Sequence, residues 1–130
     1  GPEHFSVGIM LTHLANAHGA LGDPHKKWEM LQRALKINEK HYGPEHFSVA
    51  ITLVNLANVH GNLGDPHTKR EMLQRSLKIQ EKHYGPEHFH VAATLTNLAN
   101  AHGDLGDPHK KRDMLQRALK ILEKLYGLEH

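Results

Sequence analysis

Cysteine is absent from the chain of 130 residues, and aromatic residues make up only 5% of it. The lack of cysteine excludes disulfides, thiolate nucleophiles and thiolate metal ligands, and it suits a reducing compartment. No apolar run approaches the ~20 residues that span a bilayer, and no basic segment followed by an apolar stretch opens the chain. We therefore expect a cytoplasmic protein with no membrane partner.

An excess of charge of one sign is also missing. Sixteen Lys and Arg residues stand against 14 Asp and Glu residues, which gives a net charge of +2. This balance is too even for the dense positive field of most nucleic-acid-binding proteins, so no nucleic acid partner is expected. Histidine is the abundant residue, with 14 copies, and it needs an explanation of its own.

An internal repeat with a period of 42 residues organises the chain. Residues 1–42, 43–84 and 85–126 align without a gap. One unit of this kind cannot bury its own apolar face, so repetition makes the core. We expect a single repeat array over residues 1–126, with residues 127–130 as a partial repeat or the remnant of a tag. The close likeness of the copies indicates either a recent duplication or an idealised, engineered array, and both interpretations stay open.

The second copy shows the local structure that each repeat is expected to have. Apolar residues at steps of three and four predict a first helix over residues 47–62 and a second over residues 66–84. Asp65 is the expected N-cap and Pro66 the first residue of the second helix, which ends at Gly85. Because the connection is short, the two helices must be antiparallel. The sequence thus predicts an all-α fold of three antiparallel helix-turn-helix repeats.

Several motifs recur in every copy: an LxxLA pattern in the first helix (Leu53 to Ala57), a GDP break, an RALKI-like stretch (Arg33 to Ile37) and a GPEH linker. With these motifs the unit resembles the tetratricopeptide repeat, in the longer form similar to the repeats of kinesin light chains. The resemblance covers the whole chain. It implies that the repeats stack as a right-handed superhelical solenoid, with the first helices on the concave surface. Lys69 occupies a column where that family has small alanine, so looser packing is expected there.

Charge is distributed unevenly between the two helices of each repeat. Residues 5–21 and 47–63 contain no Asp, Glu, Lys or Arg, and residues 89–105 contain only Asp104. Lys and Arg cluster on the second helices, where Glu71 stands four residues before Arg75 and predicts an exposed ion pair. Since the resemblance places the first helices on the concave surface, the implied groove is neutral.

Asparagines form a polar stripe along the first helices. An amide side chain both donates and accepts hydrogen bonds, so a row of amides can grip the backbone of an extended peptide or contact a partner helix. The resemblance implies this role for Asn55 and Asn97, whereas the structural alternative is that the amides bond loop carbonyls or water between repeats. A clamp for a terminal carboxylate is disfavoured, because these helices lack Lys and Arg. The candidate peptide-binding residues are Asn16, Asn55, Asn58, Asn97, Asn100, Thr12 and Thr96.

The histidines fall into columns with different expected properties. His18, His60 and His102 belong to the apolar stripe, where the resembled family usually has tyrosine. We expect neutral core residues in which a ring nitrogen donates to a backbone carbonyl and burial lowers the pKa. No closed four-ligand spacing predicts a functional metal site. Adventitious zinc or nickel binding is the weaker hypothesis, at Glu87, His88 and His90.

The sequence offers no case for an enzyme or a cofactor. No nucleophile, base and orienting acid are fixed together by the repeat, and the glycines, such as Gly61, are interpreted as helix punctuation. The last helix becomes more apolar, because Leu122 and Leu125 replace the polar residues of the earlier copies. We expect these leucines to be covered by another chain or by a further repeat.

Three functional hypotheses follow. The preferred one is a non-enzymatic scaffold that binds a protein or peptide on the neutral, asparagine-lined surface. The first alternative is an engineered array without a ligand that self-associates through its apolar C-terminal end. The second is a histidine-based metal or pH responder.

Overall fold

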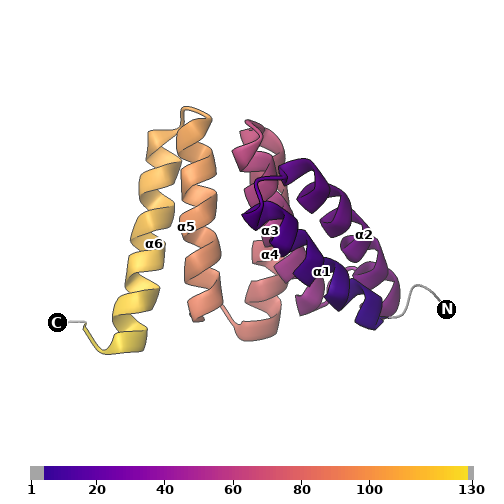
Figure 1. The fold of residues 1–130 in the computed structure, drawn as a ribbon. Coiled ribbons are helices and arrows are strands. Elements are labelled where there is room, and N and C mark those ends of the chain that lie inside the picture. The colour runs from indigo at the N-terminus through magenta and orange to yellow at the C-terminus, as the bar shows by residue number, and fades with distance from the viewer. Residues whose placement is uncertain (1–4, 129–130) are drawn as a thin grey trace.

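The structure is a computed structural model that describes residues 5–128 (Figure 1). The expected partial repeat or tag remnant at residues 127–130 therefore lies partly outside the described residues. Helices are the regular secondary structure of the described part, and the two helices of the second copy have the predicted bounds. The helices are α1 (Phe5–Ala20), α2 (Pro24–Tyr42), α3 (Phe47–Asn62), α4 (Pro66–Tyr84), α5 (Phe89–Asp104) and α6 (Pro108–Tyr126).

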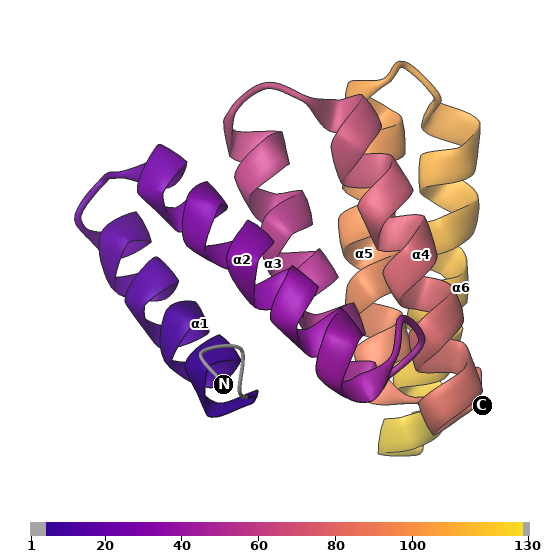
Figure 2. The same ribbon diagram turned by 90° about the vertical axis from the view of Figure 1, so that its right-hand side faces the viewer.

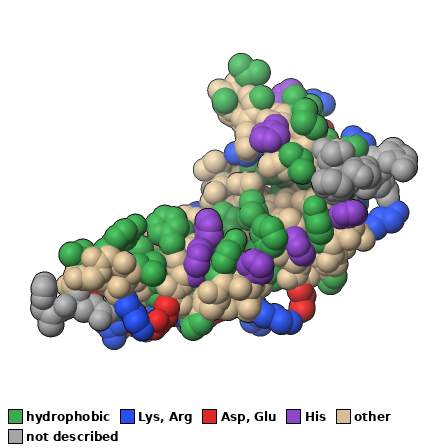
Figure 3. Space-filling view, turned by 90° about the horizontal axis from the view of Figure 1, so that it is seen from below, with side chains coloured by type: hydrophobic (Ala, Val, Ile, Leu, Met, Phe, Trp, Pro, Cys, Tyr) green, Lys and Arg blue, Asp and Glu red, His purple; other side chains and the backbone are tan. Residues whose placement is uncertain are grey.

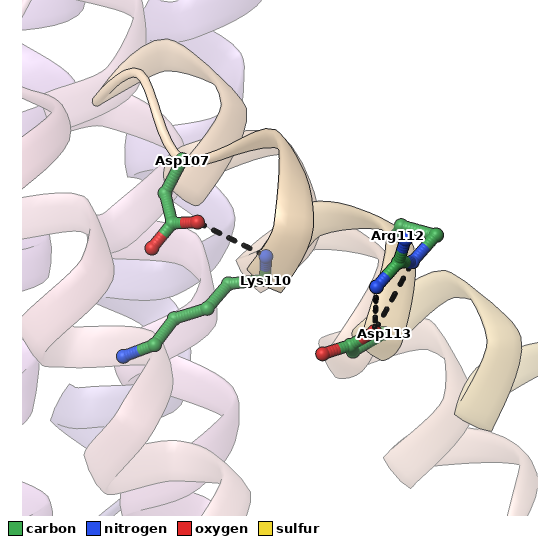
Figure 4. A network of polar contacts seen from close by, with 4 residues as sticks. All are labelled: Asp107, Lys110, Arg112 and Asp113. Carbon is green, nitrogen blue, oxygen red and sulfur yellow. Dashed lines mark hydrogen bonds and ion pairs between the residues drawn. The ribbon is translucent and has the colours of Figure 1, made fainter.

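Each second helix starts at an aspartate N-cap followed by a proline in the first turn. Asp65 Oδ1 accepts a hydrogen bond from the backbone N–H of Thr68 at 3.2 Å. Asp107 Oδ1 accepts from the backbone N–H of Lys110 at 3.1 Å (Figure 4). The hydrogen bonds from Thr68 hold the pKa of Asp65 below its usual range. The predicted start of the second helix is therefore confirmed, because the aspartate satisfies one of the free N–H groups of the first turn.

Glycine stands after the helices at the points where the backbone requires a positive φ. Gly64, between α3 and α4, has φ of +82°, and Gly85, after α4, has φ of +85°. The ψ of Gly85 is 163°, so this residue lies outside the left-handed helical region, in a part of φ/ψ space that is essentially restricted to glycine. In both places a side chain would strain the backbone, and glycine avoids that cost.

The helices pack in chain order, so that each contacts the helix before it and the helix after it (Figures 1 and 2). Leu31 of α2 and Leu56 of α3 belong to one buried cluster that joins the first repeat to the second. Leu73 of α4 and Leu98 of α5 belong to the equivalent cluster between the second repeat and the third. The apolar stripes are thus buried at seams between neighbouring repeats, as expected for a solenoid.

The glycines inside the first helices have a packing role that the interpretation as helix punctuation missed. Gly61 lies within α3, and a Cβ added to it would be 2.8 Å from Cδ of Lys69 on α4. Gly19 and Gly103 face Lys27 and Lys111 in the same way. The lysine stem therefore lies over a bare stretch of helix backbone, so the glycine supplies the space that a lysine in a small-residue column needs.

The predicted ion pair between Glu71 and Arg75 is wrong. Arg75 instead reaches the preceding repeat, where its guanidinium is 2.9 Å from Oε2 of Glu39 and donates to the carbonyl of Pro44 at 3.2 Å. Arg117 makes the same kind of contact with Glu81 at 2.6 Å. The neighbouring repeat offers a partly buried carboxylate, which is a better partner than a solvated side chain on the same helix.

Candidate protein-binding surface

The predicted asparagines lie on the face of the first helices that is turned away from the buried seams. In α3, Asn55 and Asn58 are half-buried, whereas Leu53, Leu56 and Ala57 beside them are buried. The equivalent positions of α5 and α1 carry the remaining amides. We call this set the amide strip: Asn97 is half-buried, and Asn16 and Asn100 are exposed.

The amide groups of the strip are not engaged by the protein. Within residues 5–128, none of the five side chains forms a hydrogen bond or is buried without a partner. The structural alternative, in which the amides bond loop carbonyls between repeats, therefore has no hydrogen bond to support it. Thr12 and Thr96 differ, because each hydroxyl donates at 3.0 Å to the carbonyl four residues earlier, that of Gly8 and of Ala92.

Sequence reasoning missed two apolar residues on the same face. Ile51 precedes Asn55 by one helical turn and is 50% exposed, and Ile9 has the equivalent place on α1 at 49% exposure. A β-branched apolar side chain that is half exposed on a helix gains little from the fold itself. The signal was available in the sequence, since both residues stand four positions before the column of Asn55.

A row of closely packed rings, some stacked and some edge-on, follows the linkers between the repeats, along the face on which histidines gather in Figure 3. His46 and His88 are N-caps, because Nδ1 of each accepts from the backbone N–H two residues later, at 3.1 Å. Their rings stack on the tyrosines that end the preceding helices. The successive ring centroids of Tyr42, His46, Phe47, His83, Tyr84 and His88 are 4.2 to 4.9 Å apart.

His60 and His102 occupy the same column but have different surroundings. In His60, Nε2 accepts a hydrogen bond from the indole N–H of Trp28 at 3.1 Å, and Nδ1 lies 3.6 Å from the carboxylate of Asp65. The expected donation of a ring nitrogen to a backbone carbonyl is therefore wrong for His60. Trp28 reaches across the seam from α2 and takes that place.

His102 lies opposite Arg70, which stands where the first repeat has Trp28. The ring is only 3% exposed, and its Nε2 has no hydrogen-bond partner. Burial lowers the pKa of His102, and the charges of Lys110 and Arg70 lower it further, against the opposing effect of Asp107. A neutral core histidine, as expected from the column, is therefore present in the third repeat, but its Nε2 does not make the expected donation to a backbone carbonyl.

The structure does not bring the residues of the weaker metal hypothesis together as a ligand set. Within the described part of the chain, no group of three His, Asp or Glu side chains is arranged to hold a metal ion. Oε2 of Glu87 forms an ion pair with Nζ of Lys124 at 2.6 Å. Nδ1 of His88 is used as a cap, while the rings of His88 and His90 stack with centroids 5.2 Å apart.

The two C-terminal leucines have different surroundings. Leu122 is half-buried and packs against the cluster of α5 and α6 that contains Val91 and Ile121. Leu125 is 49% exposed. Among helices α1 to α6, none has the length and apolar character that a bilayer crossing requires.

The fold is an all-α solenoid of helix pairs with a neutral surface on its first helices, which places the chain in the class of helical-repeat proteins. Two family models, both described as tetratricopeptide repeat, match residues 9–48 and residues 48–124. The chain belongs to the tetratricopeptide-repeat family. Members of this family are typically non-enzymatic scaffolds, and their fold generally mediates protein–protein interaction.

Solved structures with the same fold include BtubC (BKLC) from P. vanneervenii, with 23% identity and a TM-score of 0.89. The nearly identical TPR-like repeats of a putative kinesin light chain from P. anserina have 26% identity and a TM-score of 0.80. The alignments cover 98% and 96% of this chain but only 51% and 59% of those chains. The TPR domain of Arabidopsis FLU has 14% identity, a TM-score of 0.79, and coverage of 92% of this chain and 97% of that domain. No curated protein sequence matches the chain.

Proposed function

We propose that the chain is a non-enzymatic scaffold that binds an extended peptide along the amide strip and its two isoleucines. The observation that carries this proposal is the set of five amides without hydrogen-bond partners in the described part of the chain. Family membership supports a protein partner, because the tetratricopeptide-repeat fold generally mediates protein–protein interaction.

An extended peptide suits the strip better than a partner helix. The backbone of a helix uses its N–H and C=O groups internally, whereas an extended chain offers both to the amides. Asn55 and Asn58 on α3 and Asn97 and Asn100 on α5 repeat at the same positions, so they form two matched pairs of donors and acceptors. Ile51, which is half exposed one helical turn before Asn55, offers apolar contact for a peptide side chain.

Lack of charge on the strip favours an uncharged peptide segment. Helices α1 and α3 carry no Asp, Glu, Lys or Arg, and α5 carries only Asp104. A strongly charged ligand would gain no ion pair there and would lose hydration. The proposed ligand is therefore an extended segment with polar backbone contacts and a few apolar side chains.

The experiment is selection from a displayed random-peptide library on the immobilised chain, followed by titration of the enriched peptides. Asn58→Ala/Asn100→Ala removes two amides of the strip. We expect affinity to fall by roughly ten- to a hundredfold, because two hydrogen bonds are lost at about 0.5–1.5 kcal/mol each.

The matched control is Gln74→Ala/Gln116→Ala, which removes two exposed amides from the second helices and should leave affinity unchanged. Equal binding by the Asn58→Ala/Asn100→Ala variant and the wild type would contradict the proposal. Failure to enrich any peptide would favour the alternative of an array without a ligand.

A further inference from the structure

The two ends of the array expose columns of residues that are buried at the internal seams. Leu31 and Leu73 are fully buried, but Leu115, which is 42 residues after Leu73, is 37% exposed on α6. Leu119 is 56% exposed, whereas its equivalent Leu35 is 8% exposed. A groove of about 370 Å³ lies here. Its lining, which we call the tail face, consists of Pro108, Lys111, Arg112, Leu115, Gln116 and Leu119.

The opposite end shows the complementary columns. Leu56 and Leu98 are 0% and 1% exposed, but the equivalent Leu14 is 49% exposed on α1. Met10 is 65% exposed, whereas Thr52 in its column is 2% exposed. A groove of about 420 Å³ lies on this side. Its lining, which we call the head face, consists of Val7, Met10, Leu11, His13, Leu14 and Ala17.

From this pattern we infer that the tail face of one chain binds the head face of a second copy of the same chain, which continues the array from end to end. Inside the molecule, Leu31 meets Leu56 and Leu73 meets Leu98 at the two seams. Leu115 of one copy and Leu14 of the next are the same column pair. The partner is a second copy because its head face carries the same columns of residues that pack against α2 and α4 at the internal seams.

A reciprocal change of polarity at the two ends supports direct contact between them. At the internal seams a polar pair is buried: Nδ2 of Asn38 donates to Oγ1 of Thr52 at 3.1 Å. In the second seam Oγ1 of Thr94 donates to Oε1 of Gln80 at 2.8 Å. The same two columns hold Leu122 at the tail and Met10 at the head. Both members have changed from polar to apolar, so neither would leave a buried polar partner unsatisfied.

An ion pair is also completed by the end-to-end arrangement. Glu39 pairs with Arg75, and Glu81 pairs with Arg117, across the internal seams. The remaining members of these two columns are Glu123 at the tail and Arg33 at the head, which would pair with each other between two copies. Neither has an ion-pair partner among residues 5–128.

Because the head and tail faces differ and lie at opposite ends of the array (Figure 1), the contact is heterologous, and a dimer still leaves one head face and one tail face free. The assembly therefore grows with concentration and does not stop at a dimer. This inference is separate from the peptide-binding proposal, since the tested residues lie outside the amide strip.

The test is sedimentation velocity of the wild type and two single variants over a wide concentration range. Leu14→Glu blocks the head and Leu119→Glu blocks the tail, each in an exposed side chain, and circular dichroism checks that both variants fold. We expect the wild-type mass to rise past twice the chain mass of 14.7 kDa. Each variant alone should associate at least roughly tenfold more weakly, because a charge enters an apolar seam.

Mixing the two variants is the decisive measurement. Leu14→Glu retains a working tail and Leu119→Glu a working head, so the mixture should form a one-to-one complex that stops there. The control Leu63→Glu, at an exposure of 42% outside both faces, should associate like the wild type. A wild type that stays monomeric at millimolar concentration overturns the inference. So does a mixture that stays monomeric, a head or tail variant that alone associates like the wild type, or a control that abolishes association.

Discussion

Histidine has at least three roles in this chain, set by its column in the repeat and by the residue that faces it across the seam. His46 and His88 accept hydrogen bonds as N-caps in the linkers. His60 accepts from Trp28 across a seam. His102 is buried, with Nε2 unpartnered, beside Arg70. Capping and packing therefore account for these four histidines.

The pH dependence of stability follows from His102. Its folded pKa is lowered by burial and by Lys110 and Arg70, whereas the unfolded residue titrates near ~6.5. The unfolded state thus binds more protons below that pH. The contribution of neutral His102 is complete above about pH 6.5 and is lost as the pH falls toward the lowered folded pKa.

We predict that His102→Phe loses less stability than the wild type between about pH 7.5 and about pH 5.5, as measured by urea unfolding. One histidine changes the slope by at most about 1.4 kcal/mol per pH unit. The other thirteen histidines are present in both proteins, so the difference reports His102. An equal loss in both proteins would contradict the assignment.

At the scale of the elements, the seams combine an apolar cluster with one buried polar pair. Gln80 on α4 and Thr94 on α5 are 5% and 2% exposed, and they bond each other at 2.8 Å. A buried polar pair contributes little net stability when intact, but it costs much more when one member is left alone. It also fixes the register of the two helices, because only one alignment brings the two groups together.

Substitution of this pair should show strong coupling. Thr94→Val leaves Oε1 of Gln80 without its donor and should lower the free energy of unfolding by about 1–3 kcal/mol. Gln80→Leu/Thr94→Val should lose less than the sum of the two single variants, because neither member of the pair then leaves the other unpaired, and Ser76 keeps its hydrogen bond to the carbonyl of Ala50. Denaturant unfolding of the four proteins measures the coupling. The exposed change Gln74→Leu serves as the control, and strictly additive losses would show that the pair does not act as a unit.

At the scale of the whole molecule, stability depends on the two seams, each of which joins one repeat to the next. A solenoid has no central core, so each repeat depends on its neighbours. Trp28 is the sole tryptophan of the chain, and it bonds His60 across the first seam. Its fluorescence therefore reports the first repeat, whereas far-ultraviolet circular dichroism reports all helices.

We predict that residues 1–126 form one folding unit. We expect the fluorescence and circular dichroism transitions in urea to coincide at low protein concentration, because the cluster of Leu31 and Leu56 couples the first repeat to the second. Trp28→Arg/Arg112→Trp moves the probe to the third repeat, and in this variant too the fluorescence midpoint should equal the circular dichroism midpoint. A fluorescence midpoint well below that of circular dichroism would show separate unfolding of the first repeat.

The repeat period, the helix bounds and the aspartate caps of the second helices were determined by the sequence alone, because they depend on local spacing and on backbone preferences. Asp65, Pro66 and Gly85 act through neighbours a few residues away, which sequence patterns capture. The family likewise followed from motifs within one repeat.

Only the tertiary structure decided which groups meet between repeats. Arg75 forms its ion pair with Glu39 and not with Glu71, and the stem of Lys69 packs over the bare backbone at Gly61. The bare ends of the array became visible only when the exposure of Leu14 and Leu115 was compared with that of their buried equivalents. These facts depend on the stacking of helices that are distant in sequence, and stacking is set by the sum of many contacts that no local pattern contains.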